Sequence, residues 1–167
     1  MTGHLSKGVV NLKETVRLMI NGEHYDLTIE PRKTLLEVLR DEIGLTGTKE
    51  ACDFGSCGAC TILIDGKPIL SCLTLAVTCQ GKKIVTIEGL KQGEELHPLQ
   101  EAFIENGAIQ CGYCTPGMVL SAKALLDQNP GPTEGDIATA LEGNICRCGG
   151  YLQIIRAVRR AAEKNLR

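Results

Sequence analysis

Apolar and polar residues alternate along the first thirty residues or so in the manner of half-buried β-strands. The alternation runs over residues 15–20 and 25–29, and Asn21-Gly22 between them is a typical two-residue hairpin turn. The apolar spacing then becomes helical, with Thr34 as the expected N-cap and Gly44 as the expected C-terminal stop. A hairpin followed by an amphipathic helix is therefore predicted.

A second hairpin is predicted further along the chain. Its strands are residues 61–64 and 69–72, and Asp65-Gly66 is the turn between them. Residues 84–87 predict one more strand. Together with the first hairpin and its helix, these strands predict a small α+β sheet with one helix on its face.

The hydrophobic period changes near residue 90, and helices are predicted beyond it. Thr115-Pro116 is expected to be an N-cap followed by proline at the first helical position, and Thr133 with Asp136 resembles a capping box. The predicted helices cover residues 98–106, 115–126, 133–141 and 152–164. Four short helices predict a bundle. We therefore expect an N-terminal extension (1–13), a sheet domain (14–90), a linker (91–96) and a helical domain (97–167).

Composition excludes several classes of function. The formal net charge of −2 and the pI near 5.9 provide no basic stripe for nucleic acid. No apolar run is long enough to span a membrane, and residues 1–13 show neither a twin-arginine pair nor a hydrophobic signal core, so the cytoplasm is expected. Aromatic residues are scarce, with no Trp and two Phe, which suggests that bound groups contribute to stability.

Eight of the nine cysteines form two groups of four. The first group has the plant-type spacing for a [2Fe-2S] cluster, and zinc is the alternative because it also accepts four thiolates. Gly55 and Gly58 lie within this loop, where the backbone must approach the cluster closely. The ligands expected for the first group are Cys52, Cys57, Cys60 and Cys72.

The second group is less standard and by itself supports either metal. Its members are Cys111, Cys114, Cys146 and Cys148. The single residue between the last two requires a sharp bend, for which Gly149-Gly150 supplies the freedom. An iron–sulfur centre in the first group favours a second one here. The remaining Cys79 is expected to be a small buried hydrophobe, and an odd number of cysteines argues against a disulfide framework.

Three segments carry a resemblance to a known family. The chain from about Thr15 to Ala162 resembles the small iron–sulfur subunit of molybdenum hydroxylases, the xanthine dehydrogenase, carbon monoxide dehydrogenase and aldehyde oxidoreductase family. The matching segments are DFGSCGACT at 53–61, QCGYCTPGM at 110–118 and NICRCGGY at 144–151. The resemblance implies a β-grasp, ferredoxin-like domain followed by a four-helix domain, each with a [2Fe-2S] cluster.

The resemblance also assigns roles to individual residues. It implies that the second cysteine group lies nearer the molybdenum cofactor and that the first faces flavin. Gln110 and Cys148 match positions beside the pterin. Ala51 and Asp53 depart from the family pattern, because many members have glycine there, so the backbone of the first loop is expected to differ slightly.

The function implied by the resemblance is electron transfer within a larger oxidoreductase, with the substrate reacting in another subunit. The expected partners are a large molybdopterin-binding subunit and usually a medium FAD-binding subunit, with a dimer of heterotrimers as a candidate assembly. A stand-alone two-cluster ferredoxin and a zinc-bound interaction module are the alternatives. Aldehydes, N-heterocycles, carbon monoxide and aromatic thioesters all remain open as substrates, and so does the direction of electron flow.

Overall fold

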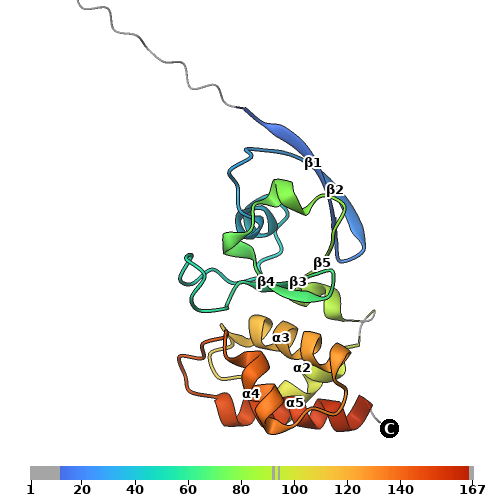
Figure 1. The fold of residues 1–167 in the computed structure, drawn as a ribbon, viewed down its shortest axis with the longest axis vertical. Coiled ribbons are helices and arrows are strands. Elements are labelled where there is room, and N and C mark those ends of the chain that lie inside the picture. Colours follow the sequence, from blue (N-terminus) through green and yellow to red (C-terminus); the bar gives the residue numbers. More distant parts are fainter. Residues whose placement is uncertain (1–11, 92, 94, 166–167) are drawn as a thin grey trace, which may run out of the picture.

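The computed structural model describes residues 12–91, 93 and 95–165, so most of the expected extension over residues 1–13 lies outside the described residues. Within the described part the chain forms a five-stranded sheet and a group of helices (Figure 1). None of the described helices is long and apolar enough to cross a bilayer. The α+β class predicted from the sequence is confirmed.

The sheet has the strand order β2-β1-β5-β3-β4. β1 pairs antiparallel with β2 and parallel with β5, and β3 pairs antiparallel with both of its neighbours. Asn21-Gly22 and Asp65-Gly66 all have the positive φ angles of tight hairpin turns, as predicted. The strands are β1 (Glu14–Ile20), β2 (Glu23–Ile29), β3 (Thr61–Ile64), β4 (Lys67–Leu70) and β5 (Lys83–Val85).

Two predicted strands end earlier than expected. The chain leaves β4 after Leu70 and makes a 3₁₀ turn over Ser71–Leu73, in which Ser71 Oγ donates to the Cys60 carbonyl at 2.8 Å. β5 ends at Val85 because the Thr86 backbone is bound by a side chain, with Thr86 N donating to Asn21 Oδ1 at 2.9 Å. Side-chain hydrogen bonds between residues distant in the sequence thus replace the strand ladder at both points.

The predicted helix after the first hairpin is present but changes its winding. α1 (Leu35–Glu37) begins with the predicted Thr34 cap, completed as a capping box by Glu37, and continues as a π-helix over Val38–Glu42. The wider turn returns the chain over the helix, where Arg40 Nη1 donates to the carbonyls of Thr46 and Thr48. This arrangement directs the following segment toward the first cysteine loop.

The remaining helices are α2 (Pro98–Glu105), α3 (Thr115–Gln128), α4 (Glu134–Leu141) and α5 (Tyr151–Asn165). The predicted capping box of Thr133 and Asp136 is confirmed, whereas the predicted N-cap Thr115 is wrong by one residue. Cys114 is the N-cap of α3, and Thr115 and Pro116 occupy its first turn. The helix therefore begins directly at a cysteine of the second group.

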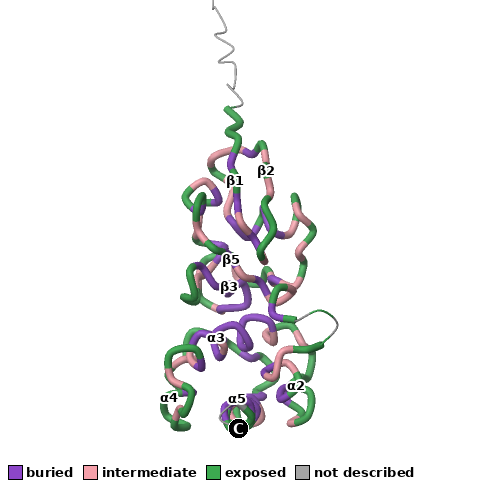
Figure 2. Tube along the Cα trace, turned by 90° about the vertical axis from the view of Figure 1, so that its right-hand side faces the viewer, coloured by how far each residue is buried: buried purple, intermediate pink, exposed green. Residues whose placement is uncertain are grey.

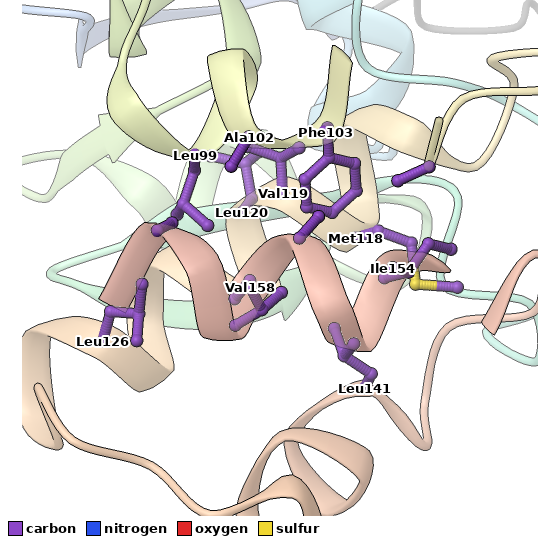
Figure 3. Close-up of a cluster of buried hydrophobic side chains, with 14 of the residues drawn as sticks. Leu99, Ala102, Phe103, Met118, Val119, Leu120, Leu126, Leu141, Ile154 and Val158 are labelled. Carbon is purple, nitrogen blue, oxygen red and sulfur yellow. The ribbon is translucent and has the colours of Figure 1, made fainter. Parts of the chain in front are cut away.

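Two hydrophobic cores meet at the sheet. One lies between the sheet and α1 and includes Leu18, Leu35 and Ile62. The other lies among the helices, where side chains of α2, α3 and α5 gather around Phe103 (Figure 3). Leu63 of β3 belongs to this second core, and α3 lies between the sheet and the other helices (Figure 2). All four residues of β3 are buried because both of its faces are covered.

Candidate iron–sulfur sites

The first cysteine loop, residues 52–60, is shaped by left-handed backbone conformations. Asp53, Gly55 and Gly58 have φ angles of 57°, 82° and 71°. A Cβ on Gly55 would lie 2.3 Å from Leu73 Cδ1, and one on Gly58 would lie 2.2 Å from the Gly143 carbonyl oxygen. Both glycines are therefore required by conformation and by space, as the sequence predicted for a loop around a cluster.

The four cysteines of the first group lie as two pairs. Cys57 contributes to the lowered pKa of Cys52, and both are half-buried, whereas Cys60 contributes to the raised pKa of Cys72, and both are buried. Cys72 reaches its partner from the 3₁₀ turn after β4, and Cys60 lies at the start of β3. The hairpin of β3 and β4 thus unites a loop cysteine with one that follows it by twelve positions.

The environment differs between the two pairs. Backbone hydrogen bonding from Phe54, helped by Cys57 and Ser56, lowers the pKa of the Cys52 thiol to about 6, and the Ser56 N–H lies 3.3 Å from Cys52 Sγ. Burial raises the pKa of the Cys72 thiol to about 12, reinforced by Cys60. N–H groups directed at sulfur favour the thiolate, which is the form that binds metal.

The second group is assembled from two segments that the helices bring together. Cys111 and Cys114 precede α3, whereas Cys146 and Cys148 lie in the loop between α4 and α5. Cys148 contributes to the shifted pKa of Cys111, and Cys146 contributes to that of Cys114, so the two segments influence each other. The predicted bend after Cys148 is confirmed by Gly149, which has a φ of 74°.

Backbone donors also surround this group. Hydrogen bonding from the Tyr113 backbone lowers the pKa of Cys111, while burial raises the pKa of Cys114 to about 12. Burial works against ionisation of Cys146, but hydrogen bonds from Gly150 and its other neighbours outweigh it and lower the Cys146 pKa. The Gly150 N–H lies 3.4 Å from Cys146 Sγ. The second group thus repeats the pattern of the first.

The donor set fits binuclear iron–sulfur clusters better than single zinc ions. Among the described residues, no three Cys, His, Asp or Glu side chains converge on a point where one ion could bind. A structural zinc ion requires four ligands around one centre. A [2Fe-2S] cluster instead takes four thiolates spread over two irons. Two pairs of soft thiolates in each group, with N–H groups beside them, have this form.

Three other residues singled out in the sequence differ in their exposure to solvent. Gln110 and Cys148 are exposed at the second group, and the Gln110 amide lies beside Gly150. Cys79 is fully buried in the sheet core, as predicted, and its Sγ contacts the Leu75 carbonyl at 3.6 Å. A cleft of 160 Å³ between the two cysteine groups has Cys57 on one side and Cys111 and Cys114 on the other.

The sequence did not reveal the residue that connects the two groups. Asn144 is 5% exposed and donates to the Gly58 carbonyl at 2.9 Å, while its own Oδ1 accepts from Ser121 Oγ at 2.7 Å. Its position two residues before Cys146 was the available signal. Hydrophobic periodicity cannot show a polar contact between segments so far apart in the chain.

Comparison with known proteins supports an iron–sulfur role for both halves. Residues 17–104 match the family described as a 2Fe-2S iron-sulfur cluster binding domain, and residues 86–159 match the [2Fe-2S] binding domain family. The small FeS subunit of nicotinate dehydrogenase from Eubacterium barkeri is 49% identical, over 91% of this chain and 97% of that protein. A probable xanthine dehydrogenase subunit of Bacillus subtilis is 50% identical, over 87% of this chain and 83% of that protein.

Solved structures agree with this relationship. A chain of quinoline 2-oxidoreductase from Pseudomonas putida 86 superposes with a TM-score of 0.87 at 47% identity, covering 90% of this chain and 94% of that one. The aldehyde oxidoreductase of Desulfovibrio desulfuricans gives 0.88 at 42% identity, covering 92% of this chain but 17% of that longer one. The chain belongs to the [2Fe-2S] iron–sulfur subunits of the molybdenum hydroxylase family.

Proposed function

We propose that this chain relays electrons, through two [2Fe-2S] clusters, between the molybdopterin centre of a large subunit and FAD or another acceptor. The observation that carries the proposal is the presence of two cysteine quartets in one chain, with Cys57 of the first quartet and Cys111 and Cys114 of the second lining one cleft. An iron–sulfur cluster supplies one-electron chemistry without proton transfer to substrate. Substrate chemistry belongs to the partner subunit.

The pairing suggests which thiolates share an iron. Cys52 and Cys57 would hold one iron of the first cluster, and Cys60 and Cys72 the other. In the second cluster, Cys111 would share an iron with Cys148 and Cys114 with Cys146. The chain's own contribution is to favour the thiolates of Cys52, Cys111 and Cys146 with backbone N–H groups and to bury Cys60, Cys72 and Cys146 away from water.

The two clusters fit a two-domain arrangement. A β-grasp domain over residues 14–90 would hold the first cluster and a four-helix domain over 97–167 the second, joined by a linker over 91–96. The two separate hydrophobic cores support this division. The contact of Leu63 with the helical core suggests that the two domains are firmly packed together.

The second quartet is proposed as the pterin-side centre. Gln110 and Cys148 are both exposed there and are free to meet a partner subunit. The expected partners are a large molybdopterin-binding subunit and a medium FAD-binding subunit, in a heterotrimer or a dimer of heterotrimers. Two clusters held by cysteine thiolates suit a reducing compartment and support the expected cytoplasmic location.

The relatives favour a role inside a complex over a stand-alone ferredoxin. Several carry names of enzyme subunits, including the nicotine 6-hydroxylase small subunit of Paenarthrobacter nicotinovorans. In the aldehyde oxidoreductase of Megalodesulfovibrio gigas the matching region is 16% of one longer chain. Because this region is part of the enzyme chain itself in that relative, we expect the present chain to act as a subunit of an enzyme complex.

The test is metal and spectroscopic analysis of the native complex. We expect about four iron atoms per copy of this chain and two distinct paramagnetic signals on reduction, because each quartet would hold one two-iron cluster. Molybdenum and flavin should copurify with the partner subunits. A colourless, zinc-containing protein would refute the proposal, and a fully active monomer in native extracts would restore the stand-alone carrier.

A further inference from the structure

The two cysteine loops are joined directly by their backbones. The Ile145 N–H donates to the Cys57 carbonyl at 2.8 Å, and each of these residues is a cysteine of one quartet or the neighbour of one. A through-bond route from Cys57 to Cys146 therefore runs along the Cys57 backbone, across this one hydrogen bond and along the Ile145 backbone. The bond itself joins two backbone groups.

Asn144 secures this contact from within. Its Nδ2 donates to the Gly58 carbonyl at 2.9 Å and approaches Thr61 Oγ1 at 3.3 Å, while Oδ1 accepts from Ser121 Oγ. The Gly58 carbonyl can only accept, so it fixes which end of the amide faces the first loop. One buried side chain thereby links the first cysteine loop, helix α3 and the second cysteine loop.

Glycines bring these three segments into contact. A Cβ on Gly117 of α3 would lie 2.4 Å from the Gly58 carbonyl oxygen, and a Cβ on Gly58 would lie 2.2 Å from that of Gly143. Gly117 has an ordinary helical conformation, so its small size serves the close approach rather than the backbone angle. Any side chain at these positions would move the two loops apart.

From these contacts we propose that Asn144 is a positioning residue that fixes the separation and electronic coupling of the two clusters. The inference rests on the proposed two-cluster function and adds to it a residue that is not a ligand. Transfer between the centres oxidises one and reduces the other by a single electron, with no bond formed or broken. The Cys57–Ile145 hydrogen bond provides the through-bond connection, and Asn144 keeps it in place.

The first experiment replaces Asn144 in the intact complex and measures coupling directly. In Asn144→Ala we expect both clusters to assemble, the magnetic interaction between the two reduced clusters to weaken or broaden, and electron transfer between them after flash reduction to slow several-fold. Asn106→Ala is the matched control, because Asn106 Nδ2 donates to the Ala102 carbonyl at the end of α2 and that bond does not join the two cysteine loops. The control should lower stability without changing coupling.

A second pair of variants tests the same contact without removing a hydrogen-bonding group. Gly117→Ala should push α3 and the Gly58 carbonyl apart and reduce the coupling, whereas Gly135→Ala in α4 meets only Thr133 Oγ1 at 3.7 Å and should leave it unchanged. If Asn144→Ala retains both clusters and matches Asn106→Ala in magnetic interaction and transfer rate, or if Gly117→Ala does so against Gly135→Ala, the proposal is overturned. Loss of the second signal in the wild-type complex would instead refute the two-cluster function itself.

Discussion

Gly58 and Gly66 share a left-handed backbone but differ in their surroundings. Gly66, in the β3–β4 turn, has a φ of 77° and open space where a Cβ would lie, whereas Gly58 has a φ of 71° and faces the Gly143 carbonyl. Substituting Gly66 therefore measures the cost of the left-handed backbone alone, and substituting Gly58 measures that cost together with the cost of a steric clash.

Alanine at each glycine should reveal that difference. We expect Gly66→Ala to lower the free energy of unfolding by about 1 kcal/mol, the cost of placing alanine in the left-handed region. Gly58→Ala should cost about 3 kcal/mol or more, because backbone strain and a collision with backbone add together. Thermal midpoints and iron content at matched loading measure this, and equal losses in the two variants would contradict the contact between the loops.

Residues of different kinds were predictable to different degrees. Cysteine spacing and the glycines within the first loop carried their meaning in the sequence, because thiolate chemistry and positive φ angles restrict the residue type. Asn144 carried only its position two residues before Cys146, because asparagine is also common in exposed loops. Only the fold shows that it is buried against Gly58.

At the scale of single elements, the histidine cap of helix α2 makes the stability of the fold depend on pH. His97 is the N-cap of α2. Its ring Nδ1 accepts from the Leu99 backbone N–H at 3.2 Å, and the His97 backbone N–H donates to Gln100 Oε1. Burial lowers the pKa of His97 below its ordinary 6.5, and the charge of Lys123 lowers it further, partly opposed by Asp127. The neutral ring is the capping form, since a proton on Nδ1 would remove the acceptor.

The wild type should therefore lose stability relative to His97→Asn on mild acidification. The unfolded chain takes up a proton near the ordinary pKa and the folded chain only at lower pH, so the capping contribution is complete above that value and declines as pH falls through it. Asparagine keeps a cap but does not titrate. Thermal midpoints from about pH 7.5 to about pH 5.5 test this, and parallel curves for the two proteins would contradict it.

The ends of helices and strands are only partly predicted by the local sequence pattern. The hairpin turns and the caps at Thr34 and Thr133 were predicted because they depend on residues adjacent in sequence. The π-helical turn over Val38–Glu42 and the early end of β5 at Val85 were not. In β5 the deciding bond comes from Asn21, a residue far away in the chain.

At the scale of the whole molecule, the two quartets have their buried members in different clusters: Cys60 and Cys72 pack with Leu36, and Cys146 belongs to the helical core. The chain has few aromatic residues, and the loops over residues 52–60 and 142–150 are joined mainly by polar contacts. Bound clusters are therefore expected to contribute folding energy, because ligands that converge in the native state are separated in the unfolded one.

Removing the iron should lower the thermal midpoint while leaving much of the fold intact. For a cluster contribution of about 3 kcal/mol, the midpoint of a chain of this size should fall by roughly 6 to 12 °C. Hydrogen exchange should rise in the two cysteine loops and remain slow in β1 and α3, whose buried residues lie in the two cores. Uniform loss of protection would show instead that the cores depend on the clusters.

The sequence by itself determined the fold class, both hairpin turns, the caps at Thr34 and Thr133 and the family, since each depends on local pattern or on a cysteine spacing that few functions share. The tertiary structure decided which of the cysteines are buried and how the two loops meet through Asn144 and the Cys57–Ile145 bond. These properties arise from contacts between residues that are distant in the chain. The packing of α3 on β3 sets those contacts, and no local pattern encodes it.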